Sequence, residues 1–239
     1  MNIAMWSGPR NLSTAMMYSF GARADCAVWD EPFYAAYLTL TGIDHPLADE
    51  TLAADECDPE KVAEACKQAH PSGSPHFYQK HMTHHMVEGV PLDWIDAVSN
   101  VFLIRHPARV LASYSKKREN PTLDDIGFRQ QVDLFEQMKA DDLPVVVVDS
   151  FDIRQSPETM LTELCERIGI AFDPAMLSWP AGGHPDDGAW APHWYGAVHR
   201  STGFAGPEGA LPEVDETLRD VFDAAMPYYE TMLAEAISV

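Results

Sequence analysis

The stretch WSGPRNLSTAMMYSF, residues 6–20, joins a short apolar run to a helical pattern through a loop. Gly8 begins the loop and Ser13 opens the helical pattern. The N–H groups at the start of a helix attract an anion, and a glycine lets a ligand approach the backbone. Ser13 and Thr14 add hydroxyl donors, and Arg10 adds a planar guanidinium that suits phosphate. The stretch predicts an anion-binding loop; a tight turn capped by Ser13 is the alternative.

The loop differs from the Walker A pattern G-x-x-x-x-G-K-[ST] of nucleoside triphosphatases. Counted from Gly8, Ser13 stands at the second glycine and Thr14 stands at the lysine. Because that lysine is missing, the loop does not predict magnesium-dependent hydrolysis of ATP.

Five β-like runs alternate with helical patterns along the chain. The alternation predicts an α/β fold with three layers, in which a central five-stranded parallel sheet lies between helices, as in P-loop nucleotide kinases. VFLIR and VVVVD are continuous apolar runs, which suit parallel strands buried on both faces. The runs are NIAMW (2–6), CAVWDE (26–31), HFYQKH (76–81), VFLIR (101–105) and VVVVD (145–149). The helical patterns cover 13–23, 31–40, 59–69, 107–118, 156–168 and 213–235.

Length and pattern predict one domain over residues 1–239, without internal repeats or a linker. Two regions have no regular pattern. Residues 42–58 are acidic and polar, and residues 179–212 are rich in Gly, Pro, Trp and His. A long irregular segment within a compact domain is often functional, so 179–212 is predicted to be a lid or substrate loop.

The charge of the chain limits its partners. The chain has 16 Lys and Arg against 37 Asp and Glu, a net charge of −21. Such a surface repels nucleic acid and anionic lipid, so a small-molecule partner is expected. The chain has no signal-peptide pattern and no apolar run of about 18 residues, which predicts a cytoplasmic protein without a membrane span. The four cysteines lack C-x-x-C spacing, as expected for reduced thiols. Oligomeric state is not indicated.

A second candidate anion site lies in FLIRHPARVLASYSK, residues 102–116. Arg105 ends a predicted strand, and ligands of such sheets bind outside the carboxyl ends of the strands. Ser113 follows two turns into the next helix. A phosphate between Arg105 and Ser113 is one interpretation; an ion pair of Arg105 with a structural carboxylate is the other.

Together the two loops resemble those of the sulfotransferases that use 3′-phosphoadenosine 5′-phosphosulfate (PAPS). In that family the loop after the first strand holds the 5′-phosphosulfate, and a stretch R-x-P-x-x-x-x-x-S holds the 3′-phosphate. The second pattern is present from Arg105 to Ser113. Arg10 stands in for the lysine of the commonest members, as in more divergent bacterial ones. Residues 145–174 resemble the strand, acidic turn and helix of the family, so the resemblance covers most of 1–174.

The resemblance implies in-line transfer of a sulfuryl group from PAPS to a hydroxyl or amine of a small molecule, without a metal. The product is 3′-phosphoadenosine 5′-phosphate (PAP). A P-loop kinase of a small metabolite and a non-catalytic nucleotide-binding protein are the alternatives. Nothing in the sequence is typical of a lysine that binds pyridoxal phosphate. The implied donor-binding residues are Gly8, Pro9, Arg10, Asn11, Leu12, Ser13, Thr14, Arg105 and Ser113, with Arg200 and Ser201 in a late basic loop.

Several residues are candidates for catalysis beside Arg10. Glu31 in WDEPF (29–33) resembles the base of bacterial members, with Asp30 as a second carboxylate and a helix cap as the alternative. Lys80 resembles the cation that meets the leaving oxygen.

His81 and His84 are further candidate bases, although the order Lys80-His81 departs from the Lys-x-His of cytosolic members. A metal at these histidines is the weaker interpretation, because only Glu88 lies near enough to add a ligand. The cluster Trp190, Trp194 and Tyr195 fits adenine stacking, an acceptor pocket, or an aromatic plug on the core.

Overall fold

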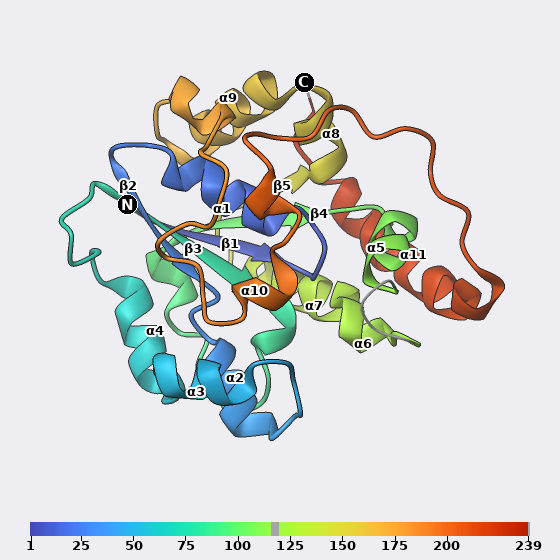
Figure 1. The fold of residues 1–239 in the computed structure, drawn as a ribbon, viewed down its shortest axis with the longest axis horizontal. Helices are drawn as coiled ribbons and strands as arrows, with labels where there is room; N and C mark the ends of the chain where they lie inside the picture. The colour runs from blue at the N-terminus through green and yellow to red at the C-terminus, as the bar shows by residue number, and fades with distance from the viewer. Residues whose placement is uncertain (116–119, 239) are drawn as a thin grey trace.

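The computed structural model describes residues 1–115 and 120–238, and its centre is one parallel β-sheet (Figure 1). The strands lie in the order β2-β3-β1-β4-β5, and every neighbouring pair is parallel. The predicted five-stranded parallel sheet is therefore confirmed. The strands are β1 (Asn2–Ser7), β2 (Cys26–Asp30), β3 (His76–Met82), β4 (Ser99–Ile104) and β5 (Val145–Asp149).

Side chains of β1 alternate between the two faces of the sheet, as the pleat requires. Ala4 and Trp6 belong to a core formed with α4, α5, α7 and α11. Ile3 and Met5 belong to a second core formed with α1 and α9. Helices therefore cover both faces, and Figure 1 shows the three layers. The helices of these cores are α1 (Ser13–Gly21), α4 (Pro59–Lys67), α5 (Pro107–Tyr114), α7 (Phe128–Ala140), α9 (Pro157–Ile168) and α11 (Arg219–Leu233).

The central position of β1 organises the carboxyl edge of the sheet. β1 pairs with β3 on one side, with Met5 opposite Lys80, and with β4 on the other, with Ser7 opposite Leu103. The loop after β1 thus separates the ends of β2 and β3 from the ends of β4 and β5. Groups at the two halves of this edge can face the same ligand from opposite sides.

Some predicted bounds differ from the structure. Residues 42–58 were expected to be a loop, but they contain α3 (Ala48–Ala54), in which only Thr51 is buried. The helix expected over 107–118 is described only to Tyr114, and residues 116–119 lie outside the described chain. The helix α7 was not predicted. The shorter helices are α2 (Tyr34–Thr41), α6 (Leu123–Ile126), α8 (Ser150–Gln155) and α10 (Ala191–Trp194).

The segment 179–212 is largely irregular, with α10 and a 3-10 turn at Val198–Arg200. It is tied to the body of the protein by buried aromatic groups, since Trp190 and Tyr195 pack with Tyr34 of α2. It passes over the carboxyl edge of the sheet, in orange in Figure 1. Over the described ranges, no helix has both the length and the apolar character needed to cross a bilayer.

Candidate active site

A cavity of about 320 Å³ lies at the carboxyl edge of the sheet. Its volume falls in the roughly 300–1,000 Å³ range of ligand pockets. Both loops singled out in the sequence reach it, together with groups from the ends of β2 and β3 and from segment 179–212. Its lining includes Pro9, Arg10, Leu12, Ser13, Thr14, Glu31, Lys80, Arg105, Ser113, Trp190, Trp194, Tyr195 and Ser201.

The loop after β1 has an unusual backbone. Arg10 and Leu12 have φ angles of 64° and 73°, in the left-handed region that non-glycine residues seldom adopt. Such strain gathers at functional sites. Leu12 directly precedes α1, whose first N–H groups have no carbonyl partner within the helix. Gly8 is required sterically, because a Cβ there would lie 2.6 Å from the carbonyl oxygen of Ile126.

Asn11 of the same loop has a structural contact. Its side chain is buried, and Nδ2 donates to the carbonyl oxygen of Leu103 in β4 at 3.2 Å. This bond holds the loop against the neighbouring strand. It directs the Asn11 amide toward β4, and Asn11 is not among the residues that line the cavity.

Two guanidinium groups meet beside Ser113. Arg10 Nε donates to Ser113 Oγ at 2.9 Å, and Arg105 Nη1 donates to the carbonyl oxygen of Arg10 at 2.8 Å. Arg105 Nε is buried and has no hydrogen-bond partner among the described residues. A buried N–H without an acceptor is costly, so this half of the cavity suits an anion.

Sequence reasoning missed Glu208, the buried carboxylate beside Arg105. Its side chain is 2% exposed and forms ion pairs with three arginines. Arg154 Nη1 lies 2.6 Å from Oε1, Arg109 Nε lies 2.8 Å from Oε2, and Arg105 also contacts Oε1. The structural ion pair considered for Arg105 is therefore present, while Arg105 still lines the cavity. No local sequence signal marks Glu208, because it lies in an irregular and otherwise exposed segment.

The other half of the cavity contains a buried ion cluster around Lys80. Lys80 Nζ lies 2.8 Å from Asp30 Oδ1, 2.5 Å from Glu31 Oε1 and 2.6 Å from Tyr195 Oη. An ammonium has three N–H donors, and each has a partner here. Burial alone would lower the pKa of Lys80, but the attraction of Asp30 and Glu31 outweighs it and raises that pKa. Lys80 therefore stays charged.

The two carboxylates of this cluster differ in position. Burial raises the pKa of Asp30 to about 6, although the charge of Lys80 opposes the shift. Glu31 lines the cavity and has a φ angle of 46°, again in the left-handed region. Its Oε1 is bound to Lys80, whereas its Oε2 lies 3.9 Å from His85 Nε2, beyond hydrogen-bond distance. The geometry leaves Glu31 Oε2 as the better placed basic atom.

The histidines predicted as alternative bases are in different environments. His81 is buried in the core, stacked on Trp6 with ring centroids 4.7 Å apart, and burial lowers its pKa to about 3. It does not line the cavity. His84 and His85 do, and burial lowers the pKa of His84 to about 4. Within the described ranges, no three His, Cys, Asp or Glu side chains converge as metal ligands would.

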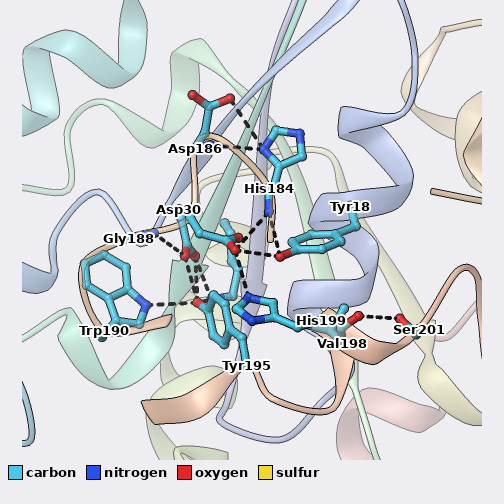
Figure 2. A network of polar contacts seen from close by, with 12 residues as sticks. Tyr18, Asp30, His184, Asp186, Gly188, Trp190, Tyr195, Val198, His199 and Ser201 are labelled. Carbon is cyan, nitrogen blue, oxygen red and sulfur yellow. Dashed lines mark hydrogen bonds and ion pairs between the residues drawn. The ribbon is translucent and has the colours of Figure 1, made fainter. Parts of the chain in front are cut away.

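The two predicted residues of the late basic loop, Arg200 and Ser201, lie in different places. Arg200 is exposed and lies outside the cavity lining, whereas Ser201 is part of it. Ser201 Oγ accepts from Trp179 Nε1 at 3.1 Å. Trp190 and Tyr195 serve both as cavity wall and as packing, and Figure 2 shows Trp190, Tyr195 and Asp30 joined by hydrogen bonds.

Comparison with known proteins places this chain in a family. Residues 1–236 match the family model described as a sulfotransferase domain. The chain belongs to this sulfotransferase family. Two Arabidopsis thaliana relatives, named branched-chain-amino-acid aminotransferase-like proteins 1 and 2, are 37% and 35% identical over 231 residues. The match covers 96% of this chain but only 41% of each relative.

Solved sulfotransferase domains share the fold. The domain from the Synechococcus PCC 7002 olefin synthase has a TM-score of 0.54 and 17% identity, covering 99% of this chain and 95% of that one. The domain from the curacin biosynthetic pathway has a TM-score of 0.55 and 13% identity, covering 94% and 97%. At these identities the likeness concerns the fold alone. The predicted membership of the sulfotransferase family and the predicted α/β fold are confirmed.

Proposed function

We propose that this sulfotransferase transfers a sulfuryl group from PAPS to a hydroxyl or amine of a small molecule, without a metal. The observation that carries the proposal is that one cavity is lined by basic groups on the β4 side of β1 and by a carboxylate on the β2 and β3 side. Arg10, Arg105 and Ser113 lie on the side of β4, and Glu31 lies on the side of β2 and β3. An anionic donor and a deprotonated nucleophile need these two environments at opposite sides of one reaction centre.

The basic half suits the two phosphate positions of the donor. Arg10 and the N–H groups at the start of α1 would hold the 5′-phosphosulfate. Arg105 and Ser113 would hold the 3′-phosphate, and the partnerless Arg105 Nε supports this assignment. PAPS, when bound, supplies the sulfuryl group and leaves as PAP. Gly8 and Asn11 would act through the shape of the loop, since one packs on Ile126 and the other on β4.

Glu31 is the proposed general base. Glu31 lines the cavity, and its Oε2 would accept the proton of the acceptor hydroxyl or amine. Lys80 holds Oε1 of the same carboxylate at 2.5 Å, which fixes the orientation of Oε2. We assign the positive charge at the leaving group to Arg10 because the three N–H groups of Lys80 already have partners. Catalysis then rests on positioning and charge stabilisation, as in phosphoryl transfer.

The proposal is tested by transfer of label from ³⁵S-labelled PAPS to a panel of small alcohols, phenols and amines. EDTA is present in the assay to remove metal ions. We expect labelled product and PAP in equal amounts, and loss of both in Glu31→Gln. Phosphorylation of the same panel with ATP and magnesium, without transfer from PAPS, would overturn the proposal in favour of a kinase. Tight PAP binding without transfer by an extensive panel would favour a non-catalytic nucleotide-binding protein.

A further inference from the structure

We propose that Tyr195 is a positioning residue that holds the Lys80–Glu31 pair in its reactive arrangement. The inference rests on the proposed function for its catalytic meaning. Tyr195 lies directly after α10, in segment 179–212, and reaches back to the ends of β2 and β3. It thus connects the predicted lid to the charged groups of the reaction.

The hydroxyl of Tyr195 has a partner for each hydrogen bond that it can accept or donate. Its oxygen accepts from Lys80 Nζ at 2.6 Å and from Trp190 Nε1 at 2.9 Å. A phenol oxygen then has one proton left to donate. Asp30 Oδ2 and Oδ1 lie at 2.8 and 2.9 Å, and Glu31 Oε1 lies at 3.2 Å. The shorter distances direct this proton to Asp30.

This arrangement decides what Lys80 can do. The Tyr195 oxygen takes the third N–H of Lys80, so the ammonium is held against Asp30 and Glu31 rather than released into the cavity. Glu31 Oε1 is thereby kept on Lys80, and Glu31 Oε2 is the oxygen that remains for the acceptor. Tyr195 acts through these two residues.

The same segment supplies a second contact to the cluster. Gly188 N donates to Asp30 Oδ2 at 3.1 Å, as Figure 2 shows. Asp30 therefore receives hydrogen bonds from two positions of segment 179–212 as well as the charge of Lys80. Each donor to a buried carboxylate favours its ionised form. Removal of the phenol hydroxyl must therefore make Asp30 easier to protonate.

Two histidines near the cluster stay neutral in this comparison. His85 Nε2 lies 3.9 Å from Glu31 Oε2 and stacks on Tyr34, with ring centroids 4.8 Å apart. His84 lies at the same wall of the cavity. Burial lowers the pKa of both histidines, to about 4 for His84. They are neutral near pH 6, where Asp30 titrates, so they do not obscure its titration.

Tyr18 of α1 provides a matched control, because its hydroxyl contacts the same segment. Its hydroxyl donates to Asp187 Oδ2 at 2.6 Å and accepts from His184 N at 3.0 Å. Figure 2 shows this second attachment beside the first. Tyr18→Phe removes one phenol hydroxyl that fastens the segment without touching Lys80 or Glu31. Comparison with this variant distinguishes a general loosening of the segment from a direct effect of Tyr195 on the ion cluster.

The test is a ¹³C NMR titration of the Asp30 carboxyl group in the wild type, Tyr195→Phe and Tyr18→Phe. The Asp30 signal is identified by its loss in Asp30→Asn. We expect its proton affinity to rise at least about threefold in Tyr195→Phe and to stay unchanged in Tyr18→Phe. Identical titrations in the wild type and Tyr195→Phe, or equal rises in both variants, would overturn the inference.

Two further measurements complete the test. Should Tyr195→Phe fail to fold, Trp190→Phe is the second variant. It removes a donor to the phenol oxygen of Tyr195 and so makes the phenol O–H a weaker donor to Asp30. The proton affinity of Asp30 should then rise, by less than is expected for Tyr195→Phe. No change in Trp190→Phe would then overturn the inference. With PAPS and an acceptor, Tyr195→Phe should lower kcat about tenfold without changing the KM for PAPS. The titration needs neither substrate, so the absence of transfer would refute the proposed function and not the positioning contact.

Discussion

Arg10 Nε donates a hydrogen bond of 2.9 Å to Ser113 Oγ, although the two residues are 103 positions apart in the chain. The bond joins the loop after β1 to α5. It places the loop guanidinium beside the hydroxyl that ends the R-x-P-x-x-x-x-x-S pattern. The two phosphate positions expected for the donor therefore share one continuous group of donors.

Ser113→Ala should weaken PAP binding by about 10- to 100-fold, because a hydrogen bond to a charged group contributes about 1.5–3 kcal/mol. Binding of AMP, which lacks the 3′-phosphate, should change less than about threefold. Isothermal titration calorimetry measures both. Equal losses for PAP and AMP would mean that Ser113 supports the loop through Arg10 without meeting the 3′-phosphate.

Glu31→Gln should reduce sulfuryl transfer by about 10²- to 10⁴-fold, the usual contribution of a general base. The amide oxygen still accepts from Lys80, but it takes no proton from the acceptor. Steady-state rates and PAP binding are measured together, with the exposed Glu60→Gln as control. Activity within threefold of the wild type would remove Glu31 from the mechanism.

Glu208→Gln should destabilise the protein by about 3 kcal/mol, since the variant leaves three guanidinium groups without their shared carboxylate. Inorganic sulfate should stabilise the variant more than the wild type, by supplying the missing negative charge. Thermal denaturation with and without sulfate measures both effects. Glu213→Gln, at an exposed position of the same loop, is the control, and equal melting temperatures in all three proteins would contradict the account.

His81 should make the free energy of unfolding depend on pH in the acid range. Burial lowers its folded-state pKa to about 3, so the unfolded chain binds the proton more readily. Its contribution to the free energy of unfolding is complete above about pH 6.5 and is lost as the pH falls toward 3. In His81→Phe the slope of stability against pH between pH 5.5 and 3.5 should decrease by about 1.4 kcal/mol per unit. Urea unfolding at several pH values checks this, and unchanged slopes would contradict it.

Much of the fold could be predicted from the sequence, because buried parallel strands form continuous apolar runs that are easily recognised. VVVVD coincides with β5, Val145–Asp149, since an apolar run of this length fits a strand covered on both faces. The helix α3 was missed because its seven residues bury only Thr51, which leaves no apolar stripe. The helix α7 does carry a stripe, with Phe128, Val132, Phe135 and Met138 buried, and its periodicity was a readable signal.

The site could be predicted only in part. Arg10, Glu31 and Ser113 lie in motifs at strand ends, and such positions meet at one edge of a parallel sheet. The contacts of Tyr195 and Glu208 depend on the path of an irregular segment, which no local pattern specifies. His81 was predicted as a candidate base at this edge, but strand alternation directs its side chain into the core.

The most direct measurement is calorimetric binding of PAP, AMP, and ATP with magnesium to the wild type and to Arg105→Ala. Arg129→Ala, an exposed arginine on α7, is the control for loss of positive charge. We predict that the wild type and Arg129→Ala bind PAP at least about tenfold more tightly than AMP, and that Arg105→Ala loses this preference. Equal affinity of the wild type for PAP and AMP, or preferential binding of ATP with magnesium, would contradict the assignment of this cavity to PAPS.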